Sequence, residues 1–134
     1  ASDNLNNPAG QTPAEAFDAN YRTKWLGSAF VNPTTLEYQF AGGSQYIIRK
    51  YAMTAGDDND DRDPRTWNFQ GSVAGGTGWV TVETRTDAWL GGRRQRNEFF
   101  VDNDTAYDRY RLNITNNWSS ADIQLSELEL YEAT

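Results

Sequence analysis

The chain is divided into many short segments by clusters of Gly, Asn and Asp, and no segment carries the apolar stripe of a long amphipathic helix. These clusters lie at 42–43, 75–78, 91–92, 102–104 and 116–117. Between them, segments such as 35–40 alternate apolar and polar residues, which is typical of a half-buried strand. Further strands are expected at 45–54, 66–71, 79–84, 95–101, 107–115 and 123–131. Strands this short and this evenly spaced predict an antiparallel β-sandwich or jelly roll.

Only the start of the chain departs from this pattern. A short helix is expected around 13–17, because Thr12 can serve as its N-cap and Glu15 stands where a capping box needs an acidic residue. Since 134 residues suit one core, we expect a single domain over 1–134, with the polar segment 1–11 as a loose terminus.

The composition excludes several kinds of chemistry. The chain has no Cys and no His, so disulfides, zinc–thiolate sites and the Ser-His-Asp and Cys-His nucleophile systems are impossible. Its net charge of −7 argues against a general nucleic-acid binder, which needs clustered Lys and Arg to neutralise phosphates. No apolar run is long enough to suggest insertion into a membrane.

Two oxygen-rich segments stand near the ends of the chain, at 15–25 and 126–131. If the fold brings them together, their carboxylate, hydroxyl and carbonyl oxygens form a site for a hard cation. The alternative is structural: Asp18 would be a turn residue that accepts a local hydrogen bond, and Glu127 a solvent-facing strand residue.

A set of ordered segments resembles a known family. These segments are 16–20 (AFDAN), 23–25 (TKW), 63–72 (DPRTWNFQGS), 110–112 (YRL) and 124–131 (QLSELELY). They are similar to the discoidin or coagulation factor 5/8 type C domains, most closely to the bacterial carbohydrate-binding modules of family 32. The resemblance runs from about residue 14 to residue 132.

The resemblance implies an eight-stranded antiparallel jelly roll with one structural calcium ion and a ligand site on the loops at one end. The matched calcium ligands are the main-chain oxygens of Glu15 and Asn20, the carboxylate of Asp18, both oxygens of Thr23, the carbonyl of Ser126 and the carboxylate of Glu127. Calcium accepts such a mixture of oxygens. Two departures stand out: Ala19 replaces a glycine that is frequent in the family, and the histidine of many galactose sites is absent.

For the ligand site, Trp118 offers a flat apolar face for a pyranose, and the neighbouring Asn117 can both donate and accept hydrogen bonds to a vicinal diol. The alternative is that Trp118 folds back over the end of the sandwich. Arg62 and Arg65 flank the Asp63-Pro64 pair of the acidic loop. Arg62 would bind a hydroxyl or a uronate, or else brace the loop through its neighbouring aspartates.

A second candidate region contains Trp89 and a run of arginines that includes Arg94 and Arg96. This combination suits an acidic polysaccharide such as alginate or pectin. Strand alternation would point Arg94 and Arg96 to one face and their neighbours to the other, so the basic side chains need not converge.

The remaining features are expected to be structural. The other tryptophans, Trp25, Trp67 and Trp79, are predicted to lie in the core. The acidic run 57–63 lacks the central glycine and the final glutamate of an EF-hand, which predicts a solvated loop.

The sequence therefore predicts a non-catalytic carbohydrate-binding module that targets an attached polysaccharide- or glycan-degrading enzyme to its substrate. The alternatives are a module specific for acidic polysaccharides, a glycoside hydrolase that uses two carboxylates, and an adhesion or membrane-binding discoidin domain. We expect a monomer that is part of a larger enzyme, binds carbohydrate, and neither binds nucleic acid nor inserts into a membrane. A secreted, cell-surface or periplasmic bacterial location fits this function.

Overall fold

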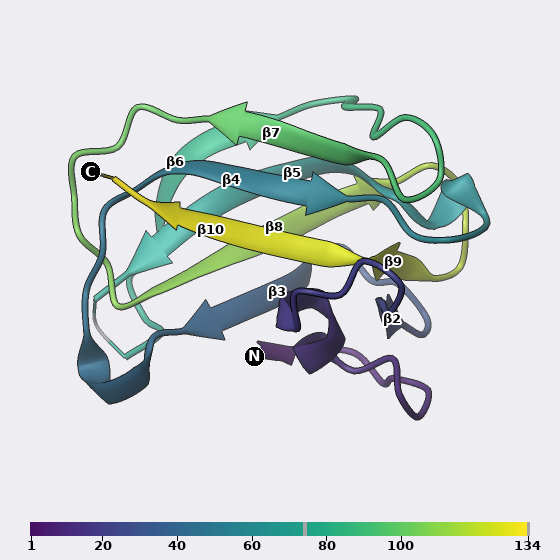
Figure 1. Cartoon of the computed structure of the whole chain (residues 1–134), viewed down its shortest axis with the longest axis horizontal. Coiled ribbons are helices and arrows are strands. Elements are labelled where there is room, and N and C mark those ends of the chain that lie inside the picture. The colour runs from purple at the N-terminus through teal and green to yellow at the C-terminus, as the bar shows by residue number, and fades with distance from the viewer. Residues whose placement is uncertain (74, 134) are drawn as a thin grey trace.

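The larger of two facing antiparallel sheets contains five strands. The computed structural model describes residues 1–73 and 75–133. In spatial order, the strands of this sheet are β1 (Ser2–Asp3), β3 (Thr34–Gln39), β8 (Arg109–Asn117), β5 (Pro64–Ser72) and β6 (Val80–Arg85) (Figure 1). The long central strands β5 and β8 alternate buried and partly exposed residues along most of their length, so one face of this sheet is turned to the core.

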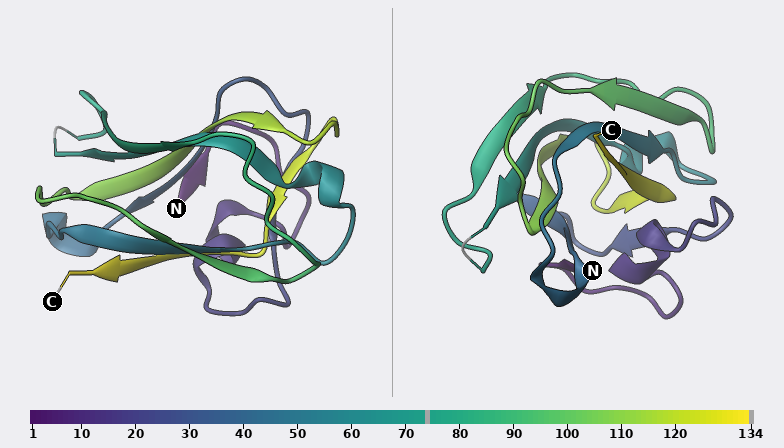
Figure 2. Two further views of the ribbon diagram at one scale, coloured as in Figure 1. Left: turned by 90° about the horizontal axis from the view of Figure 1, so that it is seen from above. Right: turned by 60° about the vertical axis from the view of Figure 1, so that its left-hand side comes forward.

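The second sheet contains β10 (Glu127–Glu132), β4 (Ile48–Thr54) and β7 (Arg96–Phe100), in that order. A further pair, β2 (Trp25–Gly27) with β9 (Ile123–Leu125), lies at one end of the sandwich. Figure 2 shows the two main sheets as separate layers. The predicted antiparallel β-sandwich is confirmed, although the expected strand 123–131 is divided at Ser126, because β9 pairs with β2 whereas β10 pairs with β4.

The helical segments are all short 3₁₀ turns: η1 (Pro13–Phe17), η2 (Ala41–Gly43) and η3 (Asp60–Arg62). The first coincides with the predicted helix and has the predicted capping box. The Glu15 carboxylate accepts hydrogen bonds from the backbone nitrogen of Thr12 at 3.3 Å and from its hydroxyl at 3.1 Å. No helix in the described part of the chain has the length and apolar character needed to cross a membrane.

The first eleven residues differ from the prediction of a loose terminus. Strand β1 pairs with β3, and the Asn7 amide donates to the Leu26 carbonyl at 2.8 Å. Trp25 is fully buried, and its indole nitrogen donates to the Asp3 carboxylate at 2.6 Å. A buried indole needs an acceptor, and the polar terminus provides it.

A stack of aromatic rings joins the two sheets. The ring centroids of Tyr51 and Phe69 lie 4.3 Å apart, and those of Phe69 and Tyr110 lie 5.3 Å apart. Trp67 donates from its indole nitrogen to the Tyr51 hydroxyl at 2.9 Å, and that hydroxyl donates to Glu83 at 2.6 Å. The polar atoms of the core aromatics are therefore satisfied within the protein.

Trp79 is the exception among the predicted core tryptophans. Trp25 and Trp67 have no exposed surface, as predicted, but Trp79 is only half-buried. The guanidinium of Arg111 lies 4.1 Å from the centroid of the Trp79 ring, and the indole nitrogen donates to the Gly76 carbonyl at 2.9 Å. The prediction was wrong because Trp79 immediately precedes β6 and packs under an arginine instead of between the sheets.

Three loops meet at one end of the sandwich, on the right in Figure 1. They are the loop after β4 (55–63), the loop before β7 (86–95) and the loop after β8 (118–122). We call this region the loop end. Segments that are distant in the sequence are thus brought together at a single surface.

Gly71 in β5 provides a test of the packing between the sheets and the 101–108 connection. A Cβ atom at position 71 would lie 2.3 Å from Cδ2 of the buried Tyr107 ring. We expect Gly71→Ala to lower the free energy of unfolding by roughly 1–3 kcal/mol because the ring must move. The control is Gly92→Ala, whose Cβ would meet nothing closer than 3.7 Å. Denaturant unfolding measures both variants, and equal stability of the two would contradict this account of the packing.

Candidate functional site

Two tryptophans form the most prominent feature of the loop end. Trp89 precedes β7 and Trp118 follows β8, and their ring centroids lie 5.3 Å apart with an interplanar angle of 85°. Trp89 is 51% exposed, which is unusual for so large an apolar side chain. We call this pair the tryptophan platform. Trp89 of the second candidate region therefore lies on the same surface as Trp118 of the first.

Trp118 is held in place from two sides. The guanidinium carbon of Arg65 lies 4.4 Å from the centroid of the Trp118 ring, and Arg65 Nε donates to the Asp87 carboxylate at 2.6 Å. The backbone nitrogen of Trp118 donates to the Asp61 carbonyl at 3.1 Å. Trp118 is thus a half-buried support, whereas Trp89 is the ring that remains open to a ligand.

Asn117 lies inside the loop that it was expected to serve. It is 6% exposed, and its amide nitrogen donates to the carbonyls of Ser120 and Asp122, each at 2.8 Å. Its side-chain oxygen accepts from the backbone nitrogen of Ser119 at 3.3 Å. Because these hydrogen bonds use the amide, Asn117 shapes the loop that carries Trp118.

Arg62 braces the acidic loop and also leaves a donor unsatisfied. Its guanidinium lies 3.6 Å from the Asp58 carboxylate and 4.0 Å from that of Asp122. Among the described residues, Arg62 Nε and Trp118 Nε1 are buried side-chain atoms without a hydrogen-bond partner. Buried donors without acceptors are costly, so these two atoms destabilise the loop end in this arrangement, and both are closed to solvent.

Backbone strain is concentrated in the same loops. Non-glycine residues adopt positive φ angles at Asn59 (34°), Asp87 (51°), Arg94 (58°) and Ser119 (135°). Such conformations cost about 1–3 kcal/mol each and are enriched at functional sites. Each loop of the loop end carries at least one of them.

A buried ion pair that sequence reasoning missed joins two of these loops. Asp63 has no exposed surface, and Arg93 donates to both of its carboxylate oxygens, at 3.1 Å and 2.5 Å. Burial raises the pKa of Asp63, and the Arg93 guanidinium opposes that rise. The prediction of a solvated loop was wrong for this residue, since nothing in the acidic run distinguishes Asp63 from its neighbours until the fold places Arg93 beside it.

Arg94 and Arg96 line a separate cleft of about 350 Å³, together with the half-exposed Tyr21 and with Glu127 and Glu129. The two arginines share a side, as strand alternation predicts, while Arg93 turns toward Asp63. Arg96 is neutralised, because it donates to Glu98 at 2.7 Å and to Glu129 at 2.9 Å. Within the described part of the chain, the Arg94 side chain has no ion pair.

The two oxygen-rich segments meet at the start of β10. The backbone nitrogen of Asn20 donates to the Asp18 carboxylate at 2.9 Å and to the Glu127 carboxylate at 3.0 Å. The Thr23 hydroxyl contacts the Asp18 carboxylate and lies 3.0 Å from the Asn20 carbonyl oxygen. We call these four residues the clasp. Ser126, which is buried, precedes Glu127, and Glu15 lies in η1 just before the clasp.

The charges of the clasp are unbalanced. Burial and the neighbouring Asp18 carboxyl raise the pKa of Glu127 to about 8. Burial also opposes ionisation of Asp18, but hydrogen bonds with Glu127, Thr23 and the Asn20 backbone lower the pKa of Asp18. No basic side chain contributes to either shift. Two adjacent carboxyl groups with no basic side chain beside them, next to hydroxyl and carbonyl oxygens, form a donor set that suits a hard cation.

The donor set of the clasp is limited in one respect. No group of three or more acidic, imidazole or thiol side chains converges anywhere in the described residues. A cation at the clasp would therefore depend on carbonyl and hydroxyl oxygens for most of its ligands, as calcium sites allow.

Ala19, which lies between Asp18 and Asn20 of the clasp, adopts the left-handed conformation, with φ of 58°. This is the position at which the family often has glycine, and the backbone here does require a positive φ. The departure from the family pattern therefore introduces strain, since the left-handed region costs an L-residue with a Cβ atom roughly 1–2 kcal/mol.

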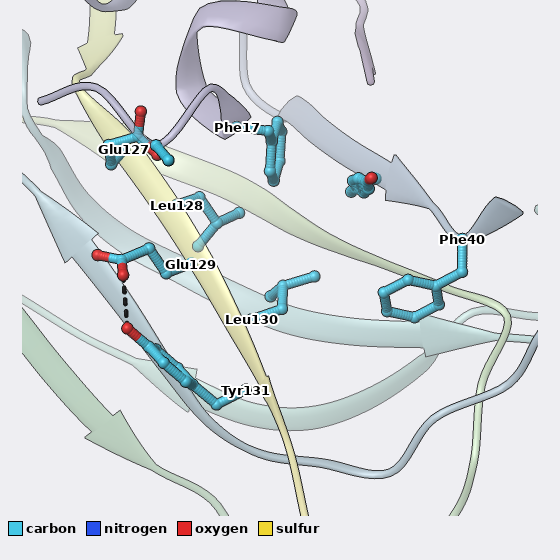
Figure 3. A pocket seen from close by; sticks show the side chains of 9 residues that line it. Phe17, Phe40, Glu127, Leu128, Glu129, Leu130 and Tyr131 are labelled. Carbon is cyan, nitrogen blue, oxygen red and sulfur yellow. Dashed lines mark hydrogen bonds between the residues drawn. The ribbon is translucent and has the colours of Figure 1, made fainter.

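A groove of about 340 Å³ runs along β10 and begins at the clasp. Figure 3 shows Leu128 and Leu130 on one side of the strand, facing Phe17 and Phe40, and Glu129 joined to Tyr131 on the other. The wall opposite β10 is aromatic, because the centroids of Phe17 and Tyr38 lie 4.9 Å apart. Sequence reasoning did not predict this groove, which depends on the gap between β10 and β3.

Comparisons with known proteins identify the fold. No family model matches the chain. A curated peptide-N(4)-(N-acetyl-beta-glucosaminyl)asparagine amidase from Arabidopsis thaliana is 25% identical over 130 residues, which are 94% of this chain but only 18% of that enzyme. The chain therefore corresponds to a small part of the relative that it matches.

Solved structures are more informative. The family 32 module from Clostridium perfringens NanJ in complex with galactose superposes with a TM-score of 0.79 and 13% identity, covering 98% of this chain and 91% of the other. Chitosan-binding module 2 of a chitosanase/glucanase from Paenibacillus sp. IK-5, in complex with chitotriose, gives 0.78 and 21%, covering 96% and 92%. The chain thus has the discoidin-like β-sandwich fold of these modules, which confirms the predicted fold.

The strain at Ala19 can be tested by relieving it. We expect Ala19→Gly to raise the free energy of unfolding by about 0.5–1 kcal/mol, because removal of the left-handed penalty exceeds the greater freedom of glycine in the unfolded chain. Ala121→Gly is the matched control, since position 121 has no positive φ, and it should give no gain. Thermal unfolding distinguishes the two, and a loss of stability in Ala19→Gly would refute the strain.

Proposed function

We propose that this chain is a non-catalytic carbohydrate-binding module whose ligand site is the tryptophan platform at the loop end. The observation that carries the proposal is the 51% exposed Trp89 ring, held perpendicular to Trp118. A flat apolar face binds the C–H side of a pyranose, and fixed polar groups beside it bind the hydroxyls.

The solved relatives support the proposal at the level of fold. Their complexes contain galactose, a GalNAc-containing disaccharide or chitotriose. By analogy, this chain would hold an attached glycan-degrading enzyme at its polymer, outside the cell or on its surface. Even weak binding at one site raises the local substrate concentration for a tethered enzyme.

A second candidate function is binding of an acidic polysaccharide. The observation in its favour is Arg94, a cation without an ion pair in a cleft that also contains the exposed Tyr21 ring. The other arginines that sequence reasoning offered for this role are committed: Arg62 to Asp58, Arg65 to Asp87 and Arg96 to Glu98 and Glu129. The acidic ligand would therefore depend on Arg94 alone.

We further propose that the clasp holds one calcium ion. The carboxylates of Asp18 and Glu127, the carbonyl of Asn20 and the oxygens of Thr23 would bind it, and the carbonyl oxygens of Glu15 and Ser126 would complete the set. The ion would neutralise the two adjacent carboxylates and tie the loop after η1 to the start of β10. Its role would be to stabilise the fold.

Affinity gel electrophoresis or calorimetry on a panel of oligosaccharides tests the binding function. We expect Trp89→Ala to abolish binding and Trp118→Ala to weaken it at least tenfold, because the first removes the open ring and the second its support. Phe100→Ala is the matched control: Phe100 is 70% exposed on the outer face of the small sheet, away from the loop end, and its loss should not affect affinity. Hydrolysed product would favour an enzyme, and unchanged affinity in both tryptophan variants would reject the platform.

The proposed calcium ion predicts that the free energy of unfolding depends on pH in the calcium-free protein and not in the calcium-bound one. In the calcium-free protein, folded Glu127 with its pKa of about 8 retains a proton that the unfolded chain, at the ordinary value of 4.5, releases. The free energy of unfolding should therefore fall as the pH rises between these two values. Saturating calcium should remove this decline and raise the melting temperature.

Thermal unfolding with and without a strong chelator, repeated across this pH range, provides the measurement. Glu127→Gln should lose both effects, whereas Glu132→Gln, an exposed change on the same strand, should keep them. Identical melting curves with calcium and with chelator, in protein shown by elemental analysis to be metal-free after chelation, would exclude the ion.

A further inference from the structure

Most of the unpaired arginines of this chain lie at one cleft. Of the 12 Lys and Arg residues, all but Arg22, Arg94 and Arg111 form an ion pair within the described part of the chain. Arg94 lines the cleft of about 350 Å³ beside the clasp, and so does Tyr21. Arg22, which sequence reasoning did not single out, lies against that ring, with its guanidinium carbon 5.6 Å from the ring centroid. Two of the three unpaired guanidinium groups are therefore placed at or beside this cleft.

The backbone fixes Arg94 at the cleft. Its φ of 58° is left-handed, and its backbone nitrogen donates to the Gly56 carbonyl at 3.0 Å. The Asp57 carboxylate also feels the charge of Arg94, but a hydrogen bond from Lys24 at 2.8 Å does more to lower the pKa of Asp57. Asp57 is thus committed to Lys24, and the Arg94 guanidinium keeps its charge for a ligand.

The clasp forms part of the wall of this cleft. Glu127 belongs to both, and Tyr21 and Arg22 lie in the turn between two clasp residues, Asn20 and Thr23. That turn is closed, because the backbone nitrogen of Thr23 donates to the Asn20 carbonyl at 3.2 Å. A cation at the clasp would therefore act on the cleft in two ways: it would change the charge on the cleft wall, and it would order the turn that carries the aromatic ring.

We propose that this cleft is a second ligand site, specific for a uronate, and that a cation bound at the clasp raises its affinity through Glu127. The inference rests on the proposed calcium ion and on the second candidate function, and it leaves the tryptophan platform as a separate sugar site. The planar guanidinium of Arg94 matches a carboxylate with two parallel hydrogen bonds. The Tyr21 ring, which is 48% exposed, offers an apolar face to the pyranose, and Arg22 adds a second positive charge.

The coupling follows from the charges that face the cleft. Arg96 and Glu129 are paired at 2.9 Å, so the remaining acidic wall is Glu127. No basic side chain contributes to the pKa shifts of Glu127 and its neighbour Asp18. In the cation-free protein, an anionic ligand would be repelled by this acidic pair, and a bound cation would cancel the repulsion. Because such coupling is reciprocal, the ligand would raise the affinity of the clasp for calcium by the same factor.

A matched pair of monosaccharides tests the coupling in both directions. Methyl galacturonide and the neutral methyl galactoside would each be titrated calorimetrically into calcium-saturated protein and into protein stripped with a chelator and dialysed free of it, at one pH and ionic strength. We expect the uronide to bind the calcium-saturated protein about fivefold more tightly or better, and the galactoside to show no calcium effect. Calcium titrated into stripped protein should bind more tightly with the uronide present, by the same factor.

Variants assign the two parts of the inference to single residues. Arg94→Gln should abolish uronide binding and leave calcium binding intact, because it removes the guanidinium and no oxygen of the clasp. Arg111→Gln is the matched control: Arg111 is the third unpaired arginine, but it lies on β8 against Trp79, so its loss should preserve uronide binding and the calcium effect. Glu127→Gln should retain uronide binding and lose its dependence on calcium.

The outcomes separate this inference from the broader function. Equal uronide affinity with and without calcium, no uptake of calcium by the stripped protein, or equal effects of Arg94→Gln and Arg111→Gln would each overturn it. Loss of uronide binding in Trp89→Ala would place the uronate at the platform and would overturn it too. Absence of uronide binding would reject the cleft as a site, whereas oligosaccharide binding that Trp89→Ala removes would still support the carbohydrate-binding function.

Discussion

The surface proposed here depends on one buried ion pair. Arg93 donates hydrogen bonds to both carboxylate oxygens of Asp63 and to the carbonyl of Asp58 at 3.1 Å. This joins the loop that carries Trp89 to the loop that supports Trp118. Removing one partner of such a pair leaves an uncompensated buried charge and typically costs about 3–5 kcal/mol. The loops at this end are therefore held by a specific interaction, although they lack regular secondary structure.

Neighbouring residues serve different parts of the molecule. Arg93 turns inward to Asp63, while Arg94, with its left-handed backbone, turns to the cleft beside the clasp. Glu127 belongs to the clasp, to this cleft and to the groove along β10. A cation bound at the clasp would thus influence two surfaces at once, because Glu127 lines both. The proposed sugar site lies apart from them, on the tryptophan platform.

Much of the fold was predictable because it depends on local pattern. Apolar–polar alternation at 35–40 and the clusters of turn residues between segments identified most strands, and the Thr12–Glu15 capping box identified η1, since these signals involve residues close in sequence. Asp3 and Trp79 were misjudged for the opposite reason. A polar residue near a terminus became an acceptor for a buried indole, and a tryptophan beside a strand packed under an arginine. Neither partner could be named before the strands were aligned.

The sequence by itself determined an all-β sandwich and excluded thiol and imidazole chemistry, because alternation, turn residues and missing residue types need no knowledge of contacts. It also nominated the oxygens of the clasp and the aromatic residues of the site. Only the tertiary structure decided that Trp89 and Trp118 form one surface and that the nearby arginines are neutralised. The reason is physical: side-chain recognition depends on distances of a few ångströms between loops, and such distances are set by the packing of the whole sandwich.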